Sequence, residues 1–203
     1  LGTQKTTYTY AFQMTGSDDA NGRLEYQSNN LAFLYDHTGV CGFRRNASIY
    51  MYRKNAMNDV IALLNMNGAV VAQYRYDAWG NCKVLDATGA ENTSSTFIGN
   101  ANPFRYRSYY FDTETGLYFL QSRYYDPKVG RFLSMDDFSY LDPDHANGMN
   151  LYAYCNNDPI NYADPSGSWA MPSWLKILIG AAVIAGLLIG ATFAPGIAGV
   201  ILG

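Results

Sequence analysis

The sequence is poor in the residues that carry most metal and nucleophile chemistry. It has 2 His and 3 Cys among 203 residues, and Cys41, Cys82 and Cys155 show no metal-ligand spacing. An odd number of thiols also argues against a disulfide framework, so we interpret them as small apolar side chains. The sequence contains no phosphate loop, dinucleotide fingerprint or Gly-x-Ser-x-Gly element. We therefore expect neither a metal nor a cofactor.

Positive charge is scarce as well. Lys and Arg number 14 against 17 Asp and Glu, which gives a formal net charge of -3. Proteins that bind nucleic acids carry a basic face that neutralises phosphates. The sequence thus predicts no nucleic-acid partner for this region. Residues 1–162 also lack a sustained 3.6-residue hydrophobic period, which disfavours a helical fold.

Tyrosine, in contrast, is abundant: all 18 Tyr lie between Tyr8 and Tyr162. Three of them, and one Phe, open a recurring unit: an aromatic residue followed by Asp, with Gly three or four residues after the Asp. In such a unit the Asp side chain can accept a hydrogen bond from the backbone just ahead, and the Gly supplies a positive φ where the chain reverses. The unit therefore predicts a β-turn between two strands. It occurs at 35–39, 76–80, 111–116 and 125–130.

Strand signals surround these turns. Pairs such as Tyr50/Tyr52 and Tyr74/Tyr76 place two rings on one face of a strand, because side chains alternate with period two. Residues 60–74 form two apolar runs about an Asn-x-Asn-Gly turn, which predicts a β-hairpin. We expect a mainly β fold of antiparallel hairpins, with the tyrosines packed across strands. A carbohydrate-binding platform is the alternative use for such a tyrosine ladder.

The repeats resemble a known family. Residues 74–81, Tyr-Arg-Tyr-Asp-Ala-Trp-Gly-Asn, resemble a YD repeat of RHS (rearrangement hotspot) proteins. A longer run resembles the RHS repeat-associated core: Asn102-Pro103-Phe104-Arg105-Tyr106-Arg107, Gly116-Leu117-Tyr118, Arg123-Tyr124-Tyr125-Asp126-Pro127, Gly130-Arg131-Phe132, Asn150-Leu151-Tyr152-Ala153-Tyr154 and Asp164-Pro165-Ser166-Gly167. The resemblance implies the end of a β-shell that encloses and delivers a C-terminal effector.

The resemblance also predicts the domain organisation. We expect a YD-repeat region at 1–100, the RHS repeat-associated core at 101–168 and a hydrophobic pretoxin segment at 169–203. The implied partners are upstream shell repeats and a C-terminal toxin domain, both expected to lie outside this chain. The implied setting is secreted or cell-surface.

Self-cleavage just after the core is a further implication of the resemblance, carried out by two aspartates as in aspartic proteases. Asp164 matches the second aspartate, and Asp136 matches the first, with Asp137 and Asp142 as alternatives to Asp136. Such chemistry needs two carboxylates whose pKa values are pushed apart. Residue types alone also allow the Asp-Pro-x-Gly element to be only a turn. The sequence departs from the family pattern after Gly167, where Ser168 replaces the usual bulky apolar residue.

The C-terminal part has a different composition. Residues 177–203 carry no charge, and two Trp and one Lys precede them. About 20 apolar residues of helix cross a bilayer core, so residues 175–195 predict a transmembrane helix and a target-cell membrane as partner. Small residues at every fourth position from 182 to 194 suit close helix packing. The same segment could instead pack inside the shell or lead into a toxin.

Together these observations predict a fragment of a bacterial RHS-repeat polymorphic toxin, whose shell encapsulates and delivers an effector. The alternative is a cell-surface or wall-associated adhesin that binds glycans through its tyrosines and is anchored by the C-terminal helix. Apart from the aspartyl self-cleavage, no catalytic motif is present, and the effector is expected beyond Gly203.

Overall fold

A computed structural model describes residues 8–12, 22–27, 30–36, 39–141, 148–168 and 171–172. The chain divides into two compact units, Leu1–Gly116 and Leu117–Gly203. Within the described residues the sheets are antiparallel, so the predicted mainly β fold is confirmed. The apolar segment 175–195 lies outside the described residues. In the part of the chain that is described, no helix has the length and apolar character needed to cross a membrane.

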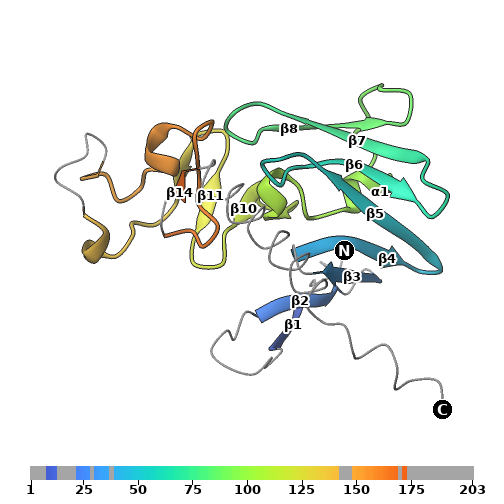
Figure 1. The fold of residues 1–203 in the computed structure, drawn as a ribbon, viewed down its shortest axis with the longest axis horizontal. Coiled ribbons are helices and arrows are strands. Elements are labelled where there is room, and N and C mark those ends of the chain that lie inside the picture. Colours follow the sequence, from blue (N-terminus) through green and yellow to red (C-terminus); the bar gives the residue numbers. More distant parts are fainter. Residues whose placement is uncertain are drawn as a thin grey trace, which may run out of the picture. The chain divides into compact units, whose positions relative to one another are not determined.

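The first unit is built on an eight-stranded sheet in which every strand pairs with its neighbours in the sequence (Figure 1). Its strands are β1 (Tyr8–Phe12), β2 (Gly22–Gln27), β3 (Leu31–Asp36), β4 (Gly39–Arg45), β5 (Ser48–Lys54), β6 (Val60–Asn65), β7 (Val70–Tyr76) and β8 (Cys82–Asp86). Helix α1 (Ile98–Ala101), the 3-10 turn η1 (Tyr106–Ser108) and β9 (Tyr110–Asp112) follow. Sequential pairing of this kind is what a chain of repeated hairpins produces.

Three of the four predicted Asp/Gly turns form as expected, and the turn at 35–39 includes residues 37 and 38, which lie outside the described residues. Asp77, Asp112 and Asp126 each accept a hydrogen bond on the side chain from the backbone N–H two residues ahead, at 2.8–3.0 Å. In each turn the Gly N–H donates to the Asp carbonyl oxygen, and the Gly φ is positive. Asp86 builds the same turn with Gly89, although no aromatic residue precedes it. The Asp and the Gly therefore define the turn, and the aromatic residue belongs to the strand.

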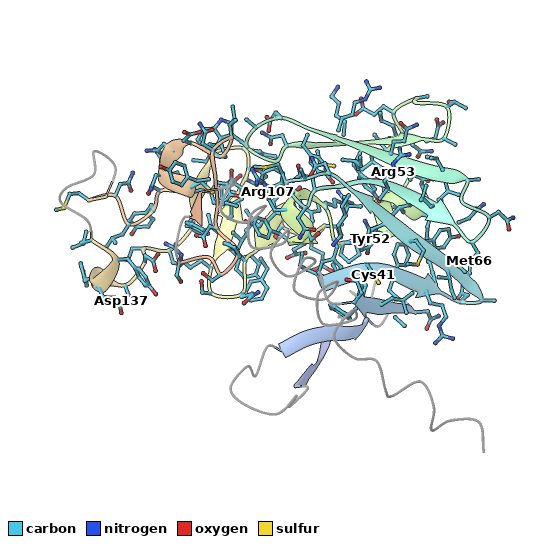
Figure 2. All side chains as sticks on the ribbon, in the orientation of Figure 1. Cys41, Tyr52, Arg53, Met66, Arg107 and Asp137 are labelled. Atoms are coloured by element: carbon cyan, nitrogen blue, oxygen red, sulfur yellow. The ribbon has the colours of Figure 1, made fainter. Side chains whose placement is uncertain are left out.

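The predicted hairpin at 60–74 is confirmed. β6 pairs with β7, and Asn65 closes the turn by accepting the N–H groups of Asn67 and Ala69 on its side chain. Met66, at the tip of this hairpin, is exposed (Figure 2).

Tyrosine and phenylalanine rings fill the core of the first unit. Phe43 on β4 contacts the rings of Tyr50 and Tyr52 on β5, at centroid distances of 5.3 and 5.9 Å. Tyr74 and Tyr76 lie with nearly parallel rings, 6.5 Å apart. These contacts confirm that the paired tyrosines share a face and pack across strands.

Residues just after the sheet complete this core. Phe104 is buried and meets Phe33 of β3 edge to face, and α1 packs on β7 and β8. Asn102 is fully buried: its side-chain oxygen accepts the Tyr52 hydroxyl at 2.6 Å, and its amide donates to the Tyr74 hydroxyl at 3.1 Å. For this reason the first compact unit runs to Gly116, beyond the boundary predicted at residue 100, and the domain limits themselves stay a prediction.

The second unit is smaller and has its own aromatic core. Its elements are β10 (Leu117–Phe119), β11 (Tyr124–Asp126), β12 (Arg131–Phe132), η2 (Phe138–Tyr140), η3 (Cys155–Asn157), β13 (Tyr162–Ala163) and β14 (Met171–Pro172). β10, β11 and β12 pair in order, and β13 pairs with β14. Tyr125 is fully buried, with the rings of Tyr118, Phe132 and Tyr154 around it at centroid distances of 4.1–6.4 Å.

Candidate functional site

A buried arginine stands at the centre of the second unit. Arg123 lies in the turn between β10 and β11, its side chain is 7% exposed, and its guanidinium covers the ring of Phe132 at 3.7 Å. Nη1 donates to the backbone oxygen of Leu151 at 2.8 Å. The arginine is therefore held by an aromatic face and a backbone carbonyl before any charged partner is considered.

Two predicted carboxylates meet at this arginine. Nη2 of Arg123 lies 2.7 Å from Oδ2 of Asp136 and 3.9 Å from Oδ2 of Asp164, and both acidic side chains are nearly buried. The structure thus brings together the two aspartates that the sequence pairs, although they are 28 residues apart in the chain. A guanidinium bridges them, which differs from two carboxylates sharing one proton.

The electrostatics of the cluster follow from burial and charge. Burial lowers the pKa of the Arg123 guanidinium, while the charges of Asp136 and Asp164 raise it. An arginine side chain stays protonated in proteins at neutral pH, so a positive charge lies between the two carboxylates. Buried charges of this kind are stable only when they are paired and hydrogen-bonded.

Asp164 also contacts the backbone just after it. Its Oδ1 accepts the N–H of Gly167 at 2.7 Å and the N–H of Ser168 at 3.1 Å, which is the turn expected of Asp-Pro-Ser-Gly. Nε of Arg123 donates to the carbonyl oxygen of Gly167. Arg123 therefore holds the oxygen end, and Asp164 the nitrogen end, of the single peptide group that joins Gly167 to Ser168.

Glycine is the only residue type that fits at position 167 without rearrangement of its neighbours. Its φ is +80°, and a Cβ added there would lie 2.5 Å from the Leu120 carbonyl oxygen and 2.6 Å from Oγ of Ser122. Because Gly167 lacks a side chain, Leu120 and Ser122, which precede β11, can lie against the backbone at Gly167, which follows β13. Ser122 Oγ donates to the carbonyl oxygen of Ser166 at 2.8 Å and lies 3.2 Å from Oγ of Ser168.

Of the two alternatives to Asp136, the described one has its carboxylate engaged at the start of η2. Asp137 is exposed and caps η2 by accepting the Ser139 N–H at 2.8 Å, and this hydrogen bond lowers its pKa (Figure 2). Asp142 lies outside the described residues. Arg123 and Ser122 were missed by the sequence-based prediction, although Arg123 begins one of the runs that carries the RHS resemblance.

No metal ligation is evident among the described residues, which contain no group of three or more His, Cys, Asp or Glu side chains suited to a metal ion. Around the peptide bond between Gly167 and Ser168 lie one guanidinium, two carboxylates and the hydroxyls of three serines, Ser122, Ser166 and Ser168.

Comparisons with known proteins place the chain in a family. The family model described as Teneurin YD-shell matches residues 4–160. The tRNA3(Ser)-specific nuclease WapA of Bacillus spizizenii is 38% identical over 173 residues, which cover 83% of this chain and 7% of that protein. Toxin protein Tse5 of Pseudomonas aeruginosa is 40% identical over 67 residues, covering 33% of this chain and 5% of that protein.

A solved structure, TcdB2-TccC3-Cdc42, has a similar fold, with a TM-score of 0.53 and 21% identity over 70% of this chain and 6% of that chain. The chain spans less than a tenth of the length of each of these proteins. The family match over residues 4–160 includes the whole eight-stranded sheet of antiparallel hairpins. The chain therefore belongs to the teneurin YD-shell family, as a segment of a YD shell.

Proposed function

We propose that this segment is the closing end of a toxin-delivering YD shell, and that it cuts the chain after the core to free a downstream effector. The relatives named as a toxin and a nuclease support the first part, because this segment covers only a small share of each of those much longer proteins. Delivery outside the producing cell, and contact of residues 175–195 with a target-cell membrane, belong to the same proposal.

One observation carries the cleavage proposal: Arg123 and Asp164 contact opposite ends of the peptide group between Gly167 and Ser168. A guanidinium N–H at the carbonyl oxygen stabilises the negative charge that develops there during attack on the carbon. A carboxyl group at the amide nitrogen is positioned to transfer to it the proton that the nitrogen must gain to leave as an amine. Hydrolysis here consumes one water and leaves a carboxylate on Gly167 and an amine on Ser168.

Asp136 serves this site through Arg123. Its carboxylate lies 2.7 Å from Nη2 of Arg123, so it restrains the orientation in which Nε points at the carbonyl oxygen of Gly167. Asp136 is therefore a positioning residue, and Asp164 and Arg123 are the groups in contact with the reacting bond.

In the full-length parent protein, Asp136→Asn is expected to slow cleavage about tenfold or more, because the neutral amide holds the guanidinium less firmly. Denaturing gels taken over time after synthesis measure the fraction cleaved. The matched control is Asp137→Asn, which changes the adjacent, exposed carboxylate and is expected to leave the rate unchanged. Equal rates for both variants would remove Asp136 from the mechanism.

A further inference from the structure

The residue on the amine side of the bond proposed to break, Ser168, carries a hydroxyl group. Oγ of Ser168 lies 3.2 Å from Oγ of Ser122, and Ser122 donates its proton to the carbonyl oxygen of Ser166. A serine hydroxyl has one proton to donate. Ser122 can therefore only accept in its contact with Ser168, which makes the Ser168 hydroxyl the donor.

This direction of hydrogen bonding affects the reactivity of Ser168. Its proton points at Ser122, so the lone pairs of its oxygen are left for another partner. Hydroxyl groups that donate in a chain, here from Ser168 to Ser122 to the Ser166 carbonyl, polarise one another and become better electron-pair donors. The Ser168 oxygen is thus prepared as a nucleophile.

The electrophile is the neighbouring carbonyl carbon. Attack by Oγ of Ser168 on the carbon of Gly167 closes a five-membered ring within two adjacent residues, and such intramolecular attack gains greatly over attack by a separate molecule. The Gly167 carbonyl oxygen already accepts the Nε–H of Arg123, which stabilises the oxyanion formed by the attack. Gly167 has no side chain to obstruct the ring.

Resting on the proposed self-cleavage, we propose that Ser168 is its nucleophile and that the reaction passes through an ester. The bond between Oγ of Ser168 and the carbon of Gly167 forms while the bond from that carbon to the Ser168 nitrogen breaks. During the attack the hydroxyl proton leaves its hydrogen bond to Ser122 and passes to the released amine, at the nitrogen that faces Oδ1 of Asp164 at 3.1 Å. Water then hydrolyses the ester: its hydroxyl goes to Gly167, and its proton returns to Oγ.

Exposure suits the second step. Gly167 itself is buried, but Ser122 is exposed and Ser168 is half-buried, so water approaches the ester from the serine side. Ser122 acts as a positioning residue, since its contacts are with Ser166 and Ser168 and its role is to orient the attacking hydroxyl.

The test uses the full-length parent protein made by cell-free synthesis, so that cleavage is followed from the moment the chain folds. Ser168→Ala removes the nucleophile and is expected to slow cleavage about a hundredfold or more. Ser168→Cys is expected to retain cleavage, because a thiol performs the same transfer through a thioester. Hydroxylamine added during the reaction is expected to leave a hydroxamate on Gly167 in the native protein.

The outcomes distinguish a failure of the Ser168 ester from a failure of the self-cleavage itself. Cleavage of Ser168→Ala at the native rate, combined with loss in Asp164→Asn, would keep the self-cleavage and replace Ser168 with water as nucleophile. An inactive Ser168→Cys variant, or a Gly167 carboxylate without hydroxamate, would also overturn the ester. A native parent that never cleaves would overturn both.

Ser122 supplies a second test. Ser122→Ala is expected to slow cleavage and to reduce the yield of hydroxamate, because the Ser168 hydroxyl loses its acceptor. Ser122→Thr keeps a hydroxyl and is expected to restore both. If Ser122→Ala retains the native rate and hydroxamate yield, the hydroxyl chain has no part in the attack.

Discussion

Asp164→Asn is expected to abolish cleavage between Gly167 and Ser168 in the full-length parent protein, with the uncut chain as the only product on a denaturing gel. Asparagine keeps an oxygen that can accept the N–H groups of Gly167 and Ser168, so the turn is retained. It cannot take up or release a proton at the leaving nitrogen. It also leaves the Arg123 charge balanced by Asp136 alone. We expect a loss of about a hundredfold or more, as for removal of other acid–base groups.

This substitution separates the two roles proposed for the Asp-Pro-Ser-Gly element. If the element is only a turn, Asp164→Asn leaves the cleavage pattern unchanged, because the backbone contacts survive. Asp158→Asn is a suitable control, since Asp158 is only half-buried and also accepts a backbone N–H three residues ahead. Loss of cleavage in both variants would point to general destabilisation.

Tyr125→Ala is expected to destabilise the second unit by about 3–5 kcal/mol, the usual effect of removing a large buried aromatic ring. Tyr125 is fully buried, and its ring lies 4.1 Å from that of Tyr154 and 6.0 Å from that of Phe132. Phe132 in turn supports the guanidinium of Arg123. Hydrogen exchange of the β10, β11 and β12 amides in the native protein measures the change in opening free energy, and slower cleavage is expected to accompany it.

The adjacent tyrosine provides the matched control. Tyr124 is 42% exposed, and its ring packs against the ring of Phe119 across the hairpin at a centroid distance of 5.1 Å. Tyr124→Ala is expected to cost less than about 1 kcal/mol, as for substitutions away from a core. Similar losses for Tyr124→Ala and Tyr125→Ala would show that the tyrosines do not form a buried core in this unit.

The hairpins could be predicted from the sequence because their signals are local. Asp77 and Gly80 lie three residues apart, and the hydrogen bonds that close their turn involve only residues 77–81. The same holds for the Asn65 turn between β6 and β7. A pattern whose interactions lie within five residues needs no knowledge of the rest of the fold.

The centre of the candidate site depends on distant contacts instead. Arg123 approaches Asp136, Leu151 and Asp164 from 13 to 41 positions away in the sequence, and no local pattern marks it as buried. The aspartate pair was predicted only through the family resemblance. Likewise, the contribution of Asn102 and Phe104 to the core of the first unit arises from packing on the sheet, which explains why that unit extends past residue 100.

Cleavage between Gly167 and Ser168 is tested most directly by the intact mass of every polypeptide in the purified full-length parent protein. We predict two polypeptides, one that ends at Gly167 with a free carboxylate and one that begins with the amine of Ser168. A single polypeptide with the mass of the uncut chain, or a break at any other bond, would contradict this cleavage.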